Sequence, residues 1–110
     1  MPLSEKARLE VYIPDSPKPK YREFLENLNR ELTHTFGGCT ILRGIDGSYL
    51  SRKGLLISDR INLIYTDAPI SIRDNPGQFS RYGEALRLAV DQALEEEAVL
   101  VVMFAVYHVE

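Results

Sequence analysis

The feature that most constrains the fold is the spacing of apolar residues, which changes along the chain between a helical period and a strand period. Apolar residues recur every three or four positions over residues 21–32 and 79–94, which is typical of helices that bury one face. Residues 8–13 alternate strictly instead, and this spacing predicts a half-buried strand. The other strand-like segments are residues 39–50, 55–66 and 98–109. The predicted order is therefore strand, helix, strand, strand, helix, strand.

Turn-forming residues mark where these elements begin and end. Ser16 and Lys18 both precede a proline, and either can open the first helix. We favour Ser16, because its hydroxyl can accept a hydrogen bond from a free helix amide. The other markers are Gly37 as a helix end, Gly44 as a bulge or bend, Gly54 in a hairpin turn and Asn75 as the cap of the second helix.

This order is that of the split βαβ, or ferredoxin-like, α+β fold. Right-handed crossovers place both helices on one face of a four-stranded antiparallel sheet with the spatial order 4-1-3-2. We expect one such domain over residues 1–110, with residues 1–7 as a tail before the first strand. The alternative is another α+β sandwich in which residues 44–49 form an additional hairpin.

The fold leaves one sheet face bare of helices, and the alternation predicts what lies there. On the first strand, the residues that point toward the helices are Leu9, Val11 and Ile13. On the third strand, the expected inward residues are Ile61, Leu63 and Tyr65. The bare face then carries a polar, mixed-charge surface that includes Arg8, Glu10, Tyr12, Arg60, Asn62 and Ile64.

The last strand is apolar on both faces, although it lies at an edge of the predicted sheet. A long edge strand without charges is prone to association unless something covers it. We therefore expect a homodimer in which a second copy packs on the bare face or along the edge. The alternative is that residues 67–74 of the same chain fold over this strand. The predicted interface residues are Leu100, Val102, Phe104 and Val106.

Composition argues against several other functions. The net charge of −3 disfavours a DNA-binding protein that works through bulk positive charge. One cysteine and two histidines disfavour a disulfide framework and a metal site, and we expect no cofactor. The chain contains no apolar run long enough to cross a bilayer and no signal-peptide pattern. We therefore expect a cytoplasmic protein that does not bind membranes.

Polar residues near the predicted hairpin are the best candidates for ligand binding. Arg43, Tyr49 and Asp59 lie on adjoining strands, and such a group can clamp a small anion through the guanidinium. The structural alternative is a cross-strand ion pair with an aromatic neighbour. The wider polar cluster adds Arg8 and Arg60. For a cofactor-free enzyme with a pocket between two subunits, the candidates are Tyr12, Arg43, Tyr49, Asp59 and His108.

Three isolated features favour structural interpretations. Cys39 follows His34 by five positions, but a cysteine that begins a strand is typical of a small buried side chain. Pro2 can expose a basic amine after removal of the initiating methionine, but residues 3–7 separate it from the first strand. RNA-recognition domains share this strand order, but the predicted bare face supplies Tyr12 alone for base stacking.

The block from Phe36 to Thr40, with Gly44, Gly47–Tyr49, Gly54 and Asp59, resembles an uncharacterised family of small bacterial proteins of unknown function. In that family a Gly-x-Thr strand leads to a glycine–aromatic pair, a short turn and an acidic residue. This chain has tyrosine and aspartate where tryptophan and glutamate are usual. The resemblance implies the same ferredoxin-like fold, supplies no activity, and marks Tyr49 and Asp59 for testing.

These features favour a binding or assembly function over a defined reaction. The leading hypothesis is a self-associating module whose bare sheet face takes a second subunit or a small anionic ligand. A cofactor-free enzyme with a pocket at the dimer interface is the first alternative, and an RNA-associated domain is the second.

Overall fold

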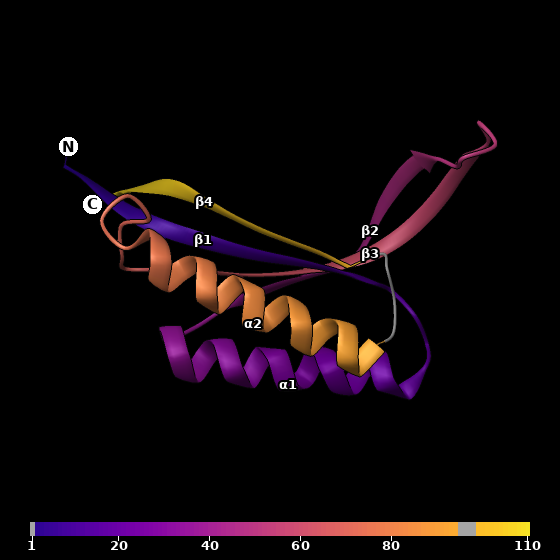
Figure 1. The fold of residues 1–110 in the computed structure, drawn as a ribbon, viewed down its shortest axis with the longest axis horizontal. Helices are drawn as coiled ribbons and strands as arrows, with labels where there is room; N and C mark the ends of the chain where they lie inside the picture. The colour runs from indigo at the N-terminus through magenta and orange to yellow at the C-terminus, as the bar shows by residue number, and fades with distance from the viewer. Residues whose placement is uncertain (1, 95–98) are drawn as a thin grey trace.

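The computed structural model describes residues 2–94 and 99–110. Its elements, in the predicted order, are β1 (Leu3–Pro14), α1 (Pro19–Phe36), β2 (Thr40–Leu50), β3 (Leu56–Ala68), α2 (Pro76–Leu94) and β4 (Leu100–Val109). The strands form one antiparallel sheet in the order β2-β3-β1-β4. Both helices lie on the same face of this sheet (Figure 1). The architecture confirms the ferredoxin-like α+β fold.

The helix boundaries follow the turn residues, with one correction. α1 has Lys18 as its N-cap and begins at Pro19, so Ser16 is not the cap. The Ser16 hydroxyl instead accepts a bond from the Lys18 amide at 3.3 Å, within the turn that precedes the helix. Gly37 ends α1 as predicted, with a φ of 93° that glycine adopts without a steric penalty. α2 begins at Pro76, also as predicted.

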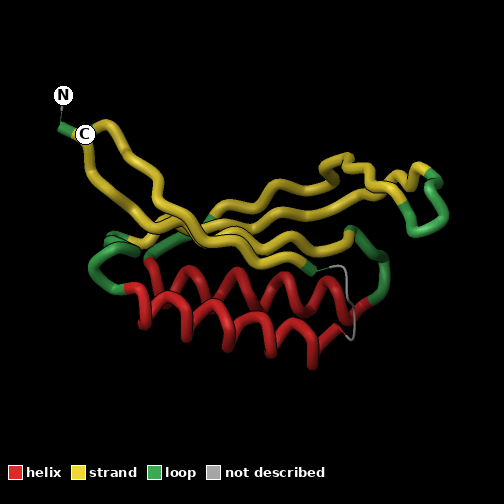
Figure 2. Tube along the Cα trace, turned by 45° about the horizontal axis from the view of Figure 1, so that its top comes forward, coloured by secondary structure: helices red, strands yellow, loops and turns green. Residues whose placement is uncertain are grey.

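β1 is longer than its alternating segment. It starts at Leu3, so residues 3–7 are strand and not the predicted tail. The first four residues of β1 pair with the last four of β4, Val106 to Val109. This ribbon lies beyond the helices (Figure 2), where no core requires apolar residues on one face. The predicted start of the last strand at Ala98 lies outside the described residues.

The core lies between the sheet and the two helices. Leu9, Val11 and Ile13 are at most 1% exposed, which confirms the predicted inward face of β1. Each such side chain contributes about 1.5–3 kcal/mol through burial. The helix residues that complete this core are Tyr21, Leu25, Leu28 and Leu32 of α1 and Leu86, Val90 and Leu94 of α2.

β3 faces the opposite way from the prediction. Ile64 is fully buried and lies beside Val11 in the strand register, so it points toward the helices. Alternation then places the predicted inward residues on the other face of the sheet. Those residues are Ile61, Leu63 and Tyr65. The bare face is accordingly more apolar than the sequence analysis expected.

Two polar residues in inward positions of β3 explain this error. The Thr66 hydroxyl donates to the Gly38 carbonyl at 2.6 Å, so its burial leaves no unpaired polar group. The Asn62 side-chain oxygen accepts a bond from the Gly44 amide at 3.0 Å. Both partners come from distant parts of the chain, and the local sequence pattern does not reveal them.

The connection after β3 packs against the last strand on the helix side of the sheet. Its apolar side chains, Ile70 and Ile72, pack with Phe79 of α2 on the helix side of the sheet. The alternative in which residues 67–74 fold over this strand therefore holds on the helix side, where Ile70 and Ile72 share a cluster with Met103 of β4, and not on the open side. Phe104 on that face is 37% exposed.

The hairpin of β2 and β3 continues past the helices as an arm, defined here as residues 45–61 (Figures 1 and 2). The arm begins at a register shift between Leu42 and Ile45, which confirms the predicted bulge at Gly44. Its turn contains Gly54 with a φ of 76°, also as predicted. Because the arm lacks a helix beneath it, its side chains contribute little to the core.

Candidate functional site

The sheet face away from the helices, called the open face, has no element packed over it within the described part of the chain (Figure 1). One apolar or aromatic side chain from each strand forms a row across this face, because the four residues are paired in register. This apolar row consists of Leu42, Leu63, Tyr12 and Leu100. Its two outer members, Leu42 and Leu100, are 45% and 53% exposed.

The predicted interface residues of the last strand also lie on the open face. Val102 pairs with Glu10, Phe104 with Arg8, and Val106 with Lys6, all in register with open-face positions of β1. Together with Leu100 they form an uncharged stripe along an edge strand. Their role in association stays a prediction.

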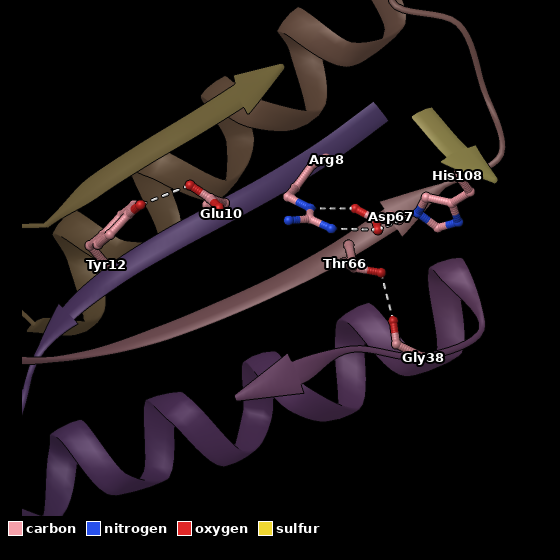
Figure 3. A network of polar contacts seen from close by, with 7 residues as sticks. All are labelled: Arg8, Glu10, Tyr12, Gly38, Thr66, Asp67 and His108. Carbon is pink, nitrogen blue, oxygen red and sulfur yellow. Dashed lines mark hydrogen bonds and ion pairs between the residues drawn. The ribbon is translucent and has the colours of Figure 1, made fainter. Parts of the chain in front are cut away.

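Three charged or ionisable side chains meet beside this stripe (Figure 3). Arg8 donates to both carboxylate oxygens of Asp67, from Nε at 2.7 Å and from Nη2 at 2.9 Å. His108 Nε2 lies 2.8 Å from Asp67 Oδ2. The Arg8 guanidinium also stacks over the Tyr65 ring at 4.3 Å. A carboxylate on β3 therefore joins side chains from β1 and β4.

This network changes the acid–base properties of its members. Hydrogen bonds from Arg8 lower the pKa of Asp67 below its ordinary value, because they favour the ionised carboxylate. The same pairing raises the pKa of Arg8. Asp67 therefore stays ionised to a lower pH than an unpaired aspartate does and keeps Arg8 paired. The network is a neutral ion pair with a histidine beside it.

A second pair lies further along β1. The Tyr12 hydroxyl donates to Glu10 Oε1 at 2.8 Å (Figure 3). This hydrogen bond raises the pKa of Tyr12, because it stabilises the protonated phenol next to a carboxylate. Tyr12 is thus held as a neutral donor in the middle of the apolar row.

The five predicted ligand residues do not converge on one pocket. Tyr12 and His108 lie on the open face, on different strands and beside different carboxylates. Tyr49 and Asp59 lie on the arm, two pairing positions apart. Arg43 lies at the bulge and lines a cleft of about 550 Å³ on the helix side. The predicted arginine–tyrosine–carboxylate clamp is therefore not assembled within this chain.

The remaining members of the predicted polar cluster have partners elsewhere. Arg8 bonds Asp67, as described above. Arg60 Nε lies 3.8 Å from Asp46 Oδ1, and both side chains are exposed. An exposed pair of this length contributes at most about 1 kcal/mol. This pair corresponds to the cross-strand ion pair that the sequence analysis gave as the alternative to a ligand clamp, with Asp46 in place of Asp59.

The candidate nucleophile and metal ligands show no shared site. Cys39 Sγ lies 2.8 Å from the Asn29 side-chain oxygen and forms part of the contact between α1 and β2. His34 is an exposed residue of the last turn of α1. No group of three or more metal-ligating side chains occurs among the residues that the structure describes.

Asp67 is the functional-site residue that sequence reasoning missed. It is 59 positions from Arg8 and was assigned to the start of a loop, whereas it belongs to β3. The signal for it is the strand register, since Arg8 and Asp67 are direct cross-strand partners. That register can be assigned only once it is known which residues of β3 point toward the helices.

Within the described ranges, neither helix combines the length and apolar character needed to cross a bilayer. Comparisons of the chain with protein-family models and with curated proteins find no match.

Proposed function

We propose that this chain is a self-associating module whose open sheet face packs against a second copy. The apolar row across the open face carries this proposal. Leu42 and Leu100 lie at its two ends, and Leu63 and Tyr12 lie between them, so the row spans all four strands. Leu63 is only 8% exposed, so the exposed apolar area of the row is at Leu42 and Leu100, with part of Tyr12 between them. Exposed apolar side chains grouped on one face are typical of a contact site.

The two edges of the sheet support a specific partner at the β4 side. β2 carries a bulge and the charged residues Arg43 and Asp46, which are common devices against unwanted pairing at an edge. β4 runs for ten residues without an aspartate, glutamate, lysine or arginine. A chain that protects one edge and leaves the other uncharged is suited to contact at the second.

The charges at the centre of the open face are compatible with such burial, whereas Lys6 carries a further positive charge on this face near the start of β1. Covering an unpaired charge is costly, but Arg8 and Asp67 already neutralise each other. Glu10 likewise has a hydrogen-bond donor in Tyr12. A second copy related by two-fold symmetry presents the same groups, so each protomer covers the apolar row of the other.

A cofactor-free enzyme remains the second candidate, and the His108–Asp67 contact favours it. A carboxylate at one imidazole nitrogen orients the ring and leaves the other nitrogen available for proton transfer. This candidate predicts that a crystal structure of the dimer encloses a cavity lined by both residues. A solvated, open surface around His108 in that dimer would exclude it.

The test of self-association is sedimentation equilibrium of the wild type and of two variants. The wild type is expected to sediment with twice the mass of one chain, and Phe104→Asp to sediment as a folded monomer. The matched control is Leu88→Asp, which places the same charge at an exposed leucine of α2. A monomeric wild type, or equal weakening by both substitutions, would contradict the proposal.

A further inference from the structure

A cleft lies on the helix side of the sheet, at the base of the arm and away from the open face. Its volume of about 550 Å³ is within the range of pockets that hold small ligands. Its walls come from the connection between β1 and α1, the first two turns of α1, and the strands β2 and β3. Figure 1 shows this connection at the end of the body where the arm begins. We call this space the arm-base cleft.

The sheet contributes polar residues to this cleft at positions that face the helices. Ile41 pairs with the buried Ile64, so alternation places Arg43, two positions further along β2, on the helix side as well. Asn62 is two positions from Ile64 on β3 and is 8% exposed. Elsewhere such inward positions hold core residues, and here they form a polar corner between the sheet and α1.

Two arginines of the arm-base cleft lack a partner. Arg22 of α1 and Arg43 of β2 both line it, and neither forms a hydrogen bond or an ion pair with any residue that the structure describes. Asp15 lines the same cleft, but its carboxylate accepts a bond from Asn62 Nδ2 at 3.4 Å and, among the described side chains, pairs with neither arginine. The cleft therefore carries an excess of positive charge in a chain whose net charge is −3.

This set of groups favours one class of ligand. A guanidinium binds a carboxylate or a phosphate through two parallel hydrogen bonds. The Asp15 carboxylate is an acceptor and repels a bare anion, whereas a hydroxyl group on the ligand can donate to it. A ligand that carries both an acidic group and a hydroxyl group therefore matches the cleft better than an inorganic ion does.

We propose that the arm-base cleft binds a small hydroxylated organic anion. Its carboxylate or phosphate group pairs with Arg22 and Arg43, and its hydroxyl group donates to Asp15. This site differs from the clamp that the sequence predicted for Arg43, because Tyr49 and Asp59 lie on the arm and do not line the cleft. The cleft is formed by one chain on its helix side, so the inference goes beyond the proposed self-association and does not depend on it.

The test is a titration of the isotope-labelled full chain, followed by nuclear magnetic resonance. The probes are glycerol phosphate, glycerate and glycerol, which share a carbon skeleton and differ in the acidic group. We expect saturable shifts of the Arg22 and Arg43 backbone amides and of the Asn62 side-chain amide with at least one of the two anions. Glycerol is expected to cause none. The anion that binds more tightly identifies the acidic group.

Substitutions then assign the binding to the two arginines. Arg22→Gln and Arg43→Gln are each expected to weaken anion binding by about tenfold or more, because each removes one charged donor group. The matched control is Arg30→Gln, which removes the same charge from α1 outside the cleft, where Arg30 donates to Asn27 at 3.3 Å. It is expected to leave the affinity unchanged, and circular dichroism checks that all three variants fold.

The outcomes separate this inference from the proposed function. The absence of saturable shifts with both anions, or equal shifts with glycerol, would overturn the inference. Equal weakening by Arg30→Gln and Arg43→Gln would also overturn it, because it would show an effect of net charge alone. Phe104→Asp is expected to bind the anion as tightly as the wild type, and a loss of binding there would contradict a site formed by one chain. A monomeric wild type that binds the anion would contradict the self-association alone.

Discussion

The Asp67→Asn substitution tests the polar network of the open face. It keeps the shape of the side chain but removes the charge that accepts two bonds from Arg8. Asp67 and Arg8 have side-chain exposures of only 14% and 27%, so little water replaces the lost contacts. Hydrogen bonds to charged groups contribute about 1.5–3 kcal/mol, and the amide oxygen retains part of this. We expect a loss of about 2 kcal/mol in the free energy of unfolding at neutral pH.

The pH dependence gives this prediction a second readout. The folded-state pKa of Asp67 is lowered from its ordinary value of 3.8. The stabilisation is therefore complete above that ordinary value and is lost as the pH falls through the lowered pKa. The stability difference between wild type and variant should shrink over this acid range.

Urea unfolding of both proteins at one protein concentration and a series of pH values measures this difference. Asp91→Asn is the matched control, because Asp91 pairs with Arg87 on α2 while both side chains are about half exposed. Its expected cost is about 0.3–0.5 kcal/mol. An equal cost for the two substitutions, or a difference that persists in acid, would refute the assignment of Asp67 as a paired, low-pKa carboxylate.

Two further substitutions test the facing of β3. Ile64→Ala is expected to lower the free energy of unfolding by about 2–5 kcal/mol, because Ile64 is fully buried. Urea unfolding measures this loss, and a value below about 1 kcal/mol would place Ile64 outside the core. Thr66→Val removes the donor to the Gly38 carbonyl and is expected to cost about 1–3 kcal/mol in the same assay. An unchanged or higher stability of Thr66→Val would contradict the buried hydrogen bond.

The sequence predicts the order and type of the elements because each has a clear local signal. The alternation of Leu9, Val11 and Ile13 is typical of a strand with one buried face, and these three side chains are buried in β1. Gly37 and Pro76 mark helix ends for reasons that are also local. Such features depend on neighbours in sequence and require no knowledge of the tertiary structure.

The errors arise where tertiary contacts replace local preference. Apolar residues Ile61, Leu63, Ile64 and Tyr65 occupy both faces of β3, so alternation does not define its inward side. The decisive contact of Thr66 is with Gly38, far along the chain. The residues of the terminal ribbon lie past the helices, where strand formation depends on pairing with β4 and not on a hydrophobic pattern.

The part of the candidate site that depends on local sequence was predictable, and the part that depends on tertiary contacts was not. The uncharged stripe from Leu100 to Val106 is a property of one segment and was identified from it. The Arg8–Asp67–His108 network joins three strands, and its members become neighbours only through the register of the sheet. Arg43 is likewise far from Asp59 because Asp59 pairs with Gly47, four positions further along β2, a register that the hairpin sets and the bulge shifts by one residue.

The central claim, that a second copy covers the open face, is tested most directly by nuclear magnetic resonance with a soluble gadolinium chelate. The methyl groups of Leu42 and Leu100 report on the open face, and those of Leu88 report on an exposed helix surface. At concentrations where the protein self-associates, we expect strong relaxation at Leu88 and protection at Leu42 and Leu100. Relaxation at Leu42 and Leu100 as strong as at Leu88 would contradict the account.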